Sequence, residues 1–373
     1  MKVALFTDSN VFAGTERHML DLAIGLRDED VEIHVACPVP SVLAERASAV
    51  GLSVIPIAKG GLLDGAAIRS LAKLLKAGTI DLLHAHNGRT ALLAAAAVAL
   101  AGRGCNVSTQ HFLAPAHVSR RGAAAFLSRC AHWWVNRHTK AFIAISEAAR
   151  AGMLARGQAP ADRIAVVPNG TPPPDLALLG SAESIRQELG IAPDALLVVS
   201  VARLEREKNL ETLIAAMRAV LAAEPRAVCL IVGDGSQRET LLAQISAFGL
   251  EGRVRLIGFR SDALAVMNAG DIFVLPSAAE SFGLVLIEAM SVEKPVIAMR
   301  AGGPGEIVEN GETGYLVTPA AVDELANALL ALLSDINLRR RMGTAGHARF
   351  MKKYTVAGMT RGTIAVYERA LTA

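Results

Sequence analysis

The sequence predicts an α/β fold made of two doubly wound parallel sheets, and three observations support this prediction. First, 373 residues exceed one ordinary core and suit two domains of about 150–200 residues each. Second, apolar residues make up 52% of the chain but aromatic residues only 4%, which favours helices packed on parallel sheets over an all-β sandwich. Third, short apolar runs alternate with helical patterns along the chain.

Each short apolar run is predicted to be a buried strand, and each helical pattern between two runs is predicted to be a crossover helix. In the first half the predicted strands are 2–7, 31–36, 53–56, 80–84, 105–109, 141–145 and 164–167. In the second half they are 195–201, 227–232, 253–257, 272–275, 295–298 and 315–317. Repeated β-α-β units of this kind predict parallel sheets with helices on both faces.

Prolines mark the boundary between the two halves. The stretch 168–175 reads Pro-Asn-Gly-Thr-Pro-Pro-Pro-Asp, and consecutive prolines continue neither a helix nor a central strand. We therefore expect an N-terminal domain over 1–175 and a C-terminal domain over 176–354. A last helical stretch follows, and residues 355–373 are expected to cross back to the N-terminal domain.

Composition argues against several classes of protein. The four cysteines are scattered without Cys-x-x-Cys spacing, which disfavours a zinc site or a disulfide framework and indicates a reducing compartment. The N-terminal apolar run reaches Asp8 too early for a signal peptide. The longest apolar stretch, 91–101, is much shorter than the roughly 20 residues that span a bilayer. These features predict a cytoplasmic protein without a membrane-spanning segment.

Positive charge gathers in the stretch 103–150. It holds seven arginines and lysines against one acid, Glu147, although the net charge of the whole chain is only +3. Two interpretations stay open: an anionic partner such as a membrane surface or a phosphorylated lipid, or a solvated helix face. His117, Arg120 and Arg121 are expected on the acceptor or membrane side. Trp133-Trp134 fits either a membrane surface or core packing.

The loops after the strands are where site residues are expected, because open α/β sheets bind ligands at the carboxyl ends of their strands. A dehydrogenase is disfavoured because no loop carries the dinucleotide-binding motif Gly-x-Gly-x-x-Gly. The loop after the first strand has only Gly14. In the loop that begins Gly233-Asp234-Gly235, the position of the third glycine is occupied by Arg238. Gly14 indicates either a close backbone approach at a helix N-terminus, suited to an anion, or a tight turn.

Two cations follow the strand 195–201. Arg203 and Lys208 are expected in the loop and near the start of the next helix, where a diphosphate can meet both charges and the helix dipole. Taken alone, the pattern also fits a surface ion-pair cluster with Glu205 and Glu207.

Two carboxylates eight residues apart follow the strand predicted to end at Leu275. Glu280 is expected on the loop and Glu288 inside the next helix, so both can face one ligand at the helix N-terminus. The backbone amides of the loop would face a phosphate there. Carboxylates accept hydrogen bonds from hydroxyl pairs, which makes sugar and ribose suitable ligands. A glycine-rich loop, 301–306, follows the next strand at the same sheet edge.

The segment from Glu280 to Glu288 resembles the Glu-x(7)-Glu motif of the retaining, GT-B-type glycosyltransferases, the glycosyl transferases group 1 family. One departure is Ala13-Gly14, where the family usually has two adjacent glycines. The resemblance implies two Rossmann-like domains that face each other across a cleft. Other matches run in the family's order along the chain: Gly14 with Glu16-Arg17-His18, His84-Ala85-His86, Gln110-His111, Ser146-Glu147, Val167-Pro168-Asn169-Gly170, Arg203 with Lys208, Gly233-Asp234-Gly235, Leu275-Pro276-Ser277, and Gly302-Gly303 with Glu306.

The resemblance also implies catalytic roles. Arg203 and Lys208 would neutralise the donor diphosphate. Glu280 would hold the transferred sugar, and Glu288 the ribose hydroxyls. His111 would contact the sugar near the reacting carbon, although a single histidine after a strand is, taken alone, more often structural. The other donor-binding residues implied by the family are Gly14, Asn169, Gly233, Gly258, Phe259, Ser281, Phe282, Gly283 and Leu284.

No metal or other cofactor is expected. Two fixed cations and a helix N-terminus can stabilise the leaving diphosphate. Asp28-Glu29-Asp30 lies between a helix and a strand on the turn opposite the ligand edge, so a solvated turn is favoured there over a metal site. Retention of anomeric configuration is implied by the family, and we favour a route in which the donor phosphate accepts the acceptor proton.

The resemblance therefore implies a retaining hexosyltransferase, and we expect it to act in cell envelope polysaccharide or lipopolysaccharide biosynthesis. It would move a sugar from a UDP-, GDP- or ADP-sugar to a hydroxyl of a lipid-linked, lipopolysaccharide-type or other saccharide acceptor, at the inner face of the membrane and without a nucleic-acid partner. Alternatives are a nucleotide-sugar epimerase or a phosphorylase on the same fold, and a non-catalytic nucleotide-sugar-binding protein.

Overall fold

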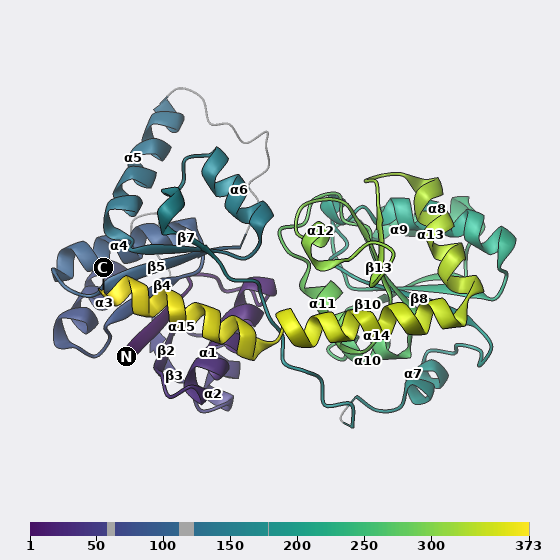
Figure 1. Cartoon of the computed structure of the whole chain (residues 1–373), viewed down its shortest axis with the longest axis horizontal. Helices are drawn as coiled ribbons and strands as arrows, with labels where there is room; N and C mark the ends of the chain where they lie inside the picture. The colour runs from purple at the N-terminus through teal and green to yellow at the C-terminus, as the bar shows by residue number, and fades with distance from the viewer. Residues whose placement is uncertain (58–63, 112–122, 178, 373) are drawn as a thin grey trace. The chain divides into compact units, whose positions relative to one another are not determined.

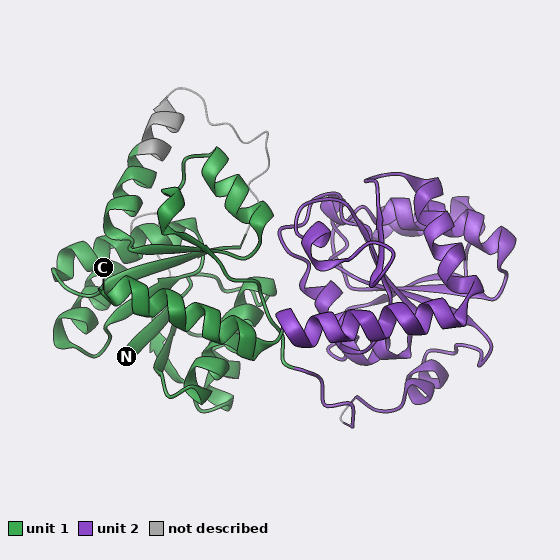
Figure 2. Ribbon diagram, viewed as in Figure 1, with its two compact units in different colours: residues 1–172, 355–373 green, residues 173–354 purple. Residues whose placement is uncertain are grey.

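The computed structural model describes residues 1–57, 64–111, 123–177 and 179–372 (Figure 1). The chain forms two compact units: unit 1 is Met1–Pro172 with Thr355–Ala373, and unit 2 is Pro173–Tyr354 (Figure 2). Each of the thirteen predicted strands is present, and every strand pair is parallel. The predicted fold class is confirmed.

Unit 1 is built on a seven-stranded sheet with the order β3-β2-β1-β4-β5-β6-β7. Because the strand order reverses between β1 and β4, the carboxyl ends of these two strands form the switch point where open α/β sheets bind ligands. The strands are β1 Lys2–Phe6, β2 Glu32–Cys37, β3 Ser53–Pro56, β4 Leu82–Ala85, β5 Cys105–Gln110, β6 Ala141–Ala144 and β7 Ile164–Val166.

The helices of unit 1 begin at polar caps in four places, where Ser41, Asp64, Asn87 and Ser146 each accept a hydrogen bond from a backbone amide of the first turn. Asp28 is the last residue of α1, and Glu29 and Asp30 lie in the turn between α1 and β2. The helices are α1 Gly14–Asp28, α2 Val42–Ala49, α3 Gly65–Ala77, α4 Gly88–Ala101, α5 Ala123–His138, α6 Glu147–Ala155 and α15 Val356–Thr372, with a short 3-10 helix at Ala161–Arg163.

Helix α15 belongs to the core of unit 1 although unit 2 separates it from the other helices in the sequence. A Cβ atom added at Gly25 of α1 would lie 2.2 Å from Thr360 Oγ1 of α15, so only glycine allows this approach. Met359, Val366 and the fully buried Tyr367 pack with the apolar side chains of α1 and the sheet. Unit 1 is therefore discontinuous in sequence.

Unit 2 is built on a six-stranded sheet with the order β10-β9-β8-β11-β12-β13, which places its switch point between β8 and β11. The strands are β8 Leu196–Val201, β9 Ala227–Val232, β10 Val254–Gly258, β11 Ile272–Leu275, β12 Val296–Met299 and β13 Gly314–Val317. The helices are α7 Ala182–Glu188, α8 Leu210–Ala223, α9 Arg238–Ala247, α10 Ala263–Ala269, α11 Leu284–Ser291, α12 Pro304–Ile307, α13 Val322–Ser334 and α14 Ile336–Lys353, with a 3-10 helix at Arg206–Lys208.

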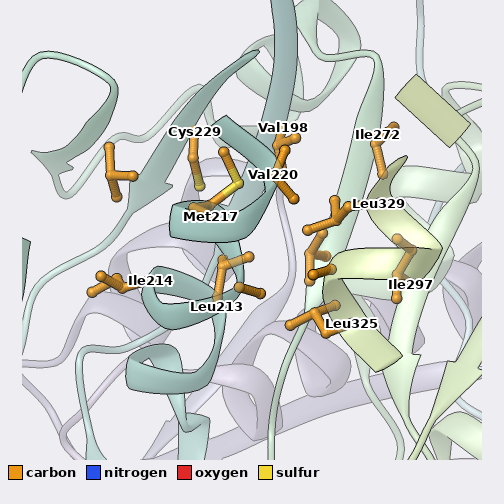
Figure 3. Close-up of a cluster of buried hydrophobic side chains, with 14 of the residues drawn as sticks. Val198, Leu213, Ile214, Met217, Val220, Cys229, Ile272, Ile297, Leu325 and Leu329 are labelled. Carbon is orange, nitrogen blue, oxygen red and sulfur yellow. The ribbon is translucent and has the colours of Figure 1, made fainter. Parts of the chain in front are cut away.

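One face of the unit 2 sheet is covered by helices α8 and α13 (Figure 3). Leu213 and Met217 of α8 and Leu325 and Leu329 of α13 recur at a spacing of four residues, so each helix turns one apolar stripe toward the strands. This packing fixes the strands and leaves the loops at their carboxyl ends to hold a ligand. Among the described residues, no helix has the length and apolar character needed to cross a bilayer.

Candidate functional site

The loops after β8 and β9 hold each other through their backbones. Leu204 N donates to Asp234 O at 2.9 Å, and Gln237 N donates to Leu204 O at 2.8 Å. A Cβ atom at Gly233 would lie 1.9 Å from Ala202 O, at a φ of +137° that favours glycine. Gly233 is therefore required for the contact between the two loops, and the loop after β8 is fixed at this edge.

A side-chain bond that the sequence did not predict strengthens the same contact. The carboxylate of Glu205 accepts hydrogen bonds from Ser236 Oγ at 2.6 Å and from Ser236 N at 3.1 Å. These bonds lower the pKa of Glu205 below its ordinary value. Glu205 therefore fixes the loop that carries Arg203 and Lys208.

The two predicted cations have different partners. Arg203 is 66% exposed, and its Nη2 lies 2.8 Å from Glu207 Oε1, so it forms the surface ion pair that the sequence left open as an alternative. Lys208 Nζ lies 2.6 Å from Glu280 Oε2, and both side chains are only 17% exposed. The structure therefore joins a residue predicted to bind phosphate to one predicted to bind the sugar.

The loop after β11 is held beside the loop after β8, which explains how Lys208 reaches Glu280. Ala278 N donates to Glu207 O at 3.0 Å, and Asn209 Nδ2 donates to Pro276 O at 3.1 Å. Asn209 has a φ of +50°, a left-handed conformation that asparagine tolerates better than most residues. A tight turn at the end of the 3-10 helix thus fixes the direction of Lys208.

The glycine-rich loop after β12 pairs with the backbone of Glu280. Gly303 N donates to Glu280 O at 2.9 Å, and Glu280 N donates to Ala301 O at 3.3 Å. A Cβ atom at Gly303 would lie 2.4 Å from the Cα atom of Phe282. The glycines therefore let this loop lie directly on the segment that carries Glu280, Ser281 and Phe282.

Helix α11 begins at Leu284, directly after this segment. Gly283 is its N-cap with a φ of +102°, and no side chain caps the helix there. The side chain of Phe282 is buried against the ring of Tyr354, at 5.9 Å between centroids, so Phe282 can offer a ligand mainly its backbone. Glu288 lies in the second turn of α11 and is half-buried. The first N–H groups of a helix have no carbonyl partner within the helix, which suits them to an anion.

The loop after β10 exposes an aromatic side chain. Phe259 is 78% exposed, whereas the neighbouring Arg260 is held in ion pairs with Glu188 and Asp262. Gly258 has a φ of +79°, and its carbonyl accepts a hydrogen bond from Gly233 N at 2.8 Å. An exposed ring beside a fixed backbone is suited to stacking on a planar group.

Unit 1 places histidines at its own switch point. His84 lies in β4, His86 and His111 follow β4 and β5, and His18 comes from α1; all four are buried. One ring nitrogen from each of His18, His86 and His111 lies within 4.8 Å of the other two. Burial lowers the pKa of His18 to about 4, and Asn169 partly opposes that shift. His111 therefore does not stand alone, which its sequence position did not reveal.

The other described residues of unit 1 that were predicted to form the site are Gly14 and Asn169. Gly14 is the exposed first residue of α1, where Glu16 Oε2 accepts a hydrogen bond from Ala13 N at 3.0 Å. Asn169 is buried. His117, Arg120 and Arg121 lie outside the described residues.

The two tryptophans of α5 have different surroundings. Trp133 is 63% exposed, whereas Trp134 packs on the His138 ring at 4.2 Å between centroids. The two neighbouring tryptophans therefore have different environments, one exposed and one packed against a ring of the same helix.

Two family models match the chain, one over each unit. The model described as Glycosyltransferase Family 4 matches residues 12–173, and the model described as Glycosyl transferases group 1 matches residues 181–349. Their boundary falls close to the boundary between the two units at Pro172.

Known proteins that this chain resembles include sugar transferases. An alpha-D-kanosaminyltransferase of Streptomyces kanamyceticus is 30% identical over 60% of each chain, so the match spans less than two thirds of that relative. The UDP-Gal:alpha-D-GlcNAc-diphosphoundecaprenol alpha-1,3-galactosyltransferase of Escherichia coli is 26% identical over 90% of this chain and 88% of its own. The crystal structure of Anabaena Alr3699/HepE in complex with UDP-glucose is 27% identical, covers all of both chains and has a TM-score of 0.85.

Proposed function

Because the chain belongs to the GT-B glycosyltransferases, we propose that it moves a sugar from a nucleoside-diphosphate sugar to a hydroxyl group, with retention of anomeric configuration and without a metal. The observation that carries this proposal is the half-buried Lys208–Glu280 ion pair at the carboxyl edge of the unit 2 sheet. It places a cation suited to a diphosphate beside a carboxylate suited to sugar hydroxyls.

The residues around this pair would complete the donor site. Arg203 is exposed and bound only on the surface, so it can turn from Glu207 to a diphosphate at modest cost. Backbone amides at the start of α11 would donate hydrogen bonds to the same diphosphate, and the carboxylate of Glu288 one turn further would accept hydrogen bonds from the ribose hydroxyls. Phe259 would lie against the base. UDP-glucose is the first donor to test, since HepE was solved with it.

The proposed reaction moves one bond and one proton. The acceptor oxygen bonds to the anomeric carbon on the face that the diphosphate leaves, the bond from carbon to phosphate oxygen breaks, and the acceptor proton passes to that phosphate. Lys208 and Arg203 would stabilise the charge that develops on the leaving diphosphate, which is worth several kcal/mol in a closed site. Glu280, held by Lys208, would position the sugar.

Single substitutions test the donor site. Lys208→Ala and Glu280→Ala should each lower the rate of sugar transfer about 100-fold or more. Each substitution removes one charge of the pair and leaves the opposite charge half-buried without its partner. Arg203→Ala should lower the rate in the same way. The measurement is release of the matching nucleoside diphosphate from UDP-glucose and from other nucleotide sugars, with melting shifts in the presence of each donor.

The matched control for Arg203 is Arg226→Ala, since Arg226 is also exposed and paired with a nearby glutamate, Glu224. This variant should keep the wild-type rate. If all three site variants keep full activity while folded, the donor site is assigned wrongly.

We also propose that the acceptor is carried by a lipid and that unit 1 contacts the membrane that holds it. The support is the exposed Trp133 on α5 together with exposed Arg137 and Lys140 at its end. The E. coli relative, whose name includes a diphosphoundecaprenol, makes a lipid-linked acceptor a reasonable expectation.

Vesicle binding tests the membrane proposal. The protein should sediment with vesicles containing anionic lipid at low salt and less at high salt, because exposed charges are screened. Trp133→Ser with Arg137→Glu should weaken binding, whereas Arg226→Glu, an equal charge change in unit 2, should not. Absence of binding to anionic vesicles at any salt concentration would contradict the proposal.

A further inference from the structure

His111 lies in a buried group of imidazoles, and its nearest polar partner is another histidine. His86 Nδ1 lies 3.1 Å from His111 Nε2, and the two rings are nearly parallel at 22°. The edge of His18 meets the His111 ring at 4.7 Å between centroids. The exposed fractions of His86 and His111 are 0% and 6%, so the bond between them is shielded from water.

His84 forms the wall behind His86. Its Nδ1 lies 2.6 Å from Tyr367 Oη and its Nε2 lies 2.6 Å from Thr109 Oγ1, so both nitrogens are used. The His84 ring lies 4.1 Å from the His86 ring between centroids. His84 therefore holds the His86 ring by packing and does not compete for its nitrogens.

All four imidazoles are neutral at neutral pH. Burial lowers the pKa of His18, His84, His86 and His111, and neighbouring imidazoles lower those of the last three further. A neutral imidazole has one N–H donor and one acceptor nitrogen. The hydrogen bond between His86 and His111 therefore has one donor and one acceptor, and the tautomers of the two rings are coupled.

The surroundings of His86 Nε2 decide which ring donates. This atom is buried and has no hydrogen-bond partner among the described residues. If it carried the proton, an N–H group would be buried unpaired, and such orphan donors are rarer than unpaired acceptors. The proton of His86 therefore belongs on Nδ1, from which it is donated to His111 Nε2. The proton of His111 then belongs on its Nδ1.

We propose that His86 is a positioning residue that fixes His111 in its Nδ1–H tautomer, so that His111 offers a hydrogen-bond donor to a sugar oxygen. The hydrogen-bond partner of one ring nitrogen sets which nitrogen carries the proton. Free histidine prefers the Nε2–H tautomer, so the Nδ1–H tautomer of His111 requires such a partner. The role toward a sugar rests on the proposed function. The tautomer of His111 is measured without any sugar donor or sugar acceptor present. The proposed tautomer and the proposed function can therefore fail separately.

A metal ion is the competing explanation for the unpaired nitrogens. His18, His86 and His111 each have one ring nitrogen within 4.8 Å of the other two, and no carboxylate or thiolate among the described residues joins this group. The 3.1 Å separation of His86 Nδ1 and His111 Nε2 fits a hydrogen bond without an ion. Metal content is therefore measured in the same experiment.

The test is a long-range ¹H–¹⁵N spectrum of protein labelled with ¹⁵N-histidine, in which the protonated nitrogen of each ring is identified. His111 is assigned from its missing signals in His111→Gln. The expected pattern is Nδ1–H for His111 in the wild type. His86→Asn, whose amide can donate from the position of Nδ1, should keep it, and His86→Leu should shift His111 toward Nε2–H.

The internal control is His34, whose Nδ1 bonds to Ser53 Oγ in the same unit, and its signals should stay unchanged in both variants. An Nε2–H tautomer of His111 in the wild type would overturn the proposal, even if His86→Leu does not fold. An unchanged tautomer in folded His86→Leu would also overturn it. So would one zinc ion per chain whose removal by a chelator changes the signals of His18, His86 and His111.

Discussion

His18 shows at the residue scale how burial sets the charge of a side chain. It lies in α1 with both ring nitrogens buried. Burial lowers its pKa from 6.5 to about 4. When the pKa of a histidine is lower in the folded state than in the unfolded state, acid protonates the unfolded chain first. This protonation favours unfolding, so the free energy of unfolding falls as the pH drops from the unfolded pKa to the folded pKa.

We expect the free energy of unfolding to fall between pH 6.5 and pH 4, because the unfolded state binds a proton at His18 that the folded state does not. His18 alone should remove about 3 kcal/mol by pH 4, since one pKa unit corresponds to about 1.4 kcal/mol. The lowered pKa values of His84, His86 and His111 act in the same direction. Urea unfolding at a series of pH values measures the slope.

The matched pair of variants is His18→Asn and His34→Asn. The first should flatten the slope, whereas the second changes a histidine of β2 outside the buried group and should leave it unchanged. A stability that stays constant from pH 7 to pH 4 would contradict the expected charge state.

The chemistry of single residues was only partly predictable from the sequence. The spacing of Glu280 and Glu288 predicted a loop residue followed by a helix residue, and both lie so. The ion pair between Lys208 and Glu280 was not predicted, because it depends on backbone bonds between loops 72 residues apart. Glu205 was interpreted only as part of a surface ion-pair cluster, since its bond to Ser236 joins two different loops.

At the scale of elements, the strands could be predicted from the sequence. The contacts of α15 within unit 1 could not. Short apolar runs between turn residues mark buried parallel strands directly. The sequence suggested that the last helix crosses back, but no local pattern pairs Tyr367 with a histidine 283 residues earlier. That contact depends on where α15 lies, which only the packing of the whole unit determines.

Tyr367 is expected to be the most sensitive position of α15. Tyr367→Ala should destabilise unit 1 by about 3–5 kcal/mol, because it removes a fully buried ring and opens a cavity. Tyr367→Phe should cost less, about 1–3 kcal/mol, because it keeps the ring but leaves His84 Nδ1 unpaired. Thermal and urea unfolding measure both changes.

The control on the same helix is Leu371→Ala, since Leu371 is 43% exposed and should change stability little. If Tyr367→Ala is no more harmful than Leu371→Ala, the position of α15 in unit 1 is wrong.

At the scale of the whole molecule, the two units differ in continuity. Unit 2 is one uninterrupted stretch, 173–354, whereas unit 1 combines 1–172 with 355–373. Because each unit has its own apolar core, each meets the physical requirement for folding alone once all its residues are present.

We expect the fragment 173–354 to fold alone and to bind a nucleoside diphosphate, while 1–172 stays unfolded because the core of unit 1 lacks Met359, Val366 and Tyr367. Joining 1–172 to 355–373 through a short glycine-serine linker should restore folding, since Val356 N already donates to Thr171 O at 3.1 Å. Circular dichroism and calorimetry of the three fragments check this. A cooperative transition in 1–172 alone would contradict it.

The discontinuity of unit 1 also has a consequence for biosynthesis. Helix α15 leaves the ribosome only after all of 173–354, a delay of roughly 10–40 s at about 5–20 residues per second. During this time the apolar surface that α15 will cover stays open to water, while unit 2 can already fold. The usual order, in which the N-terminal domain matures first, is therefore reversed, and the nascent first half is the part of this chain with the greatest need for a chaperone.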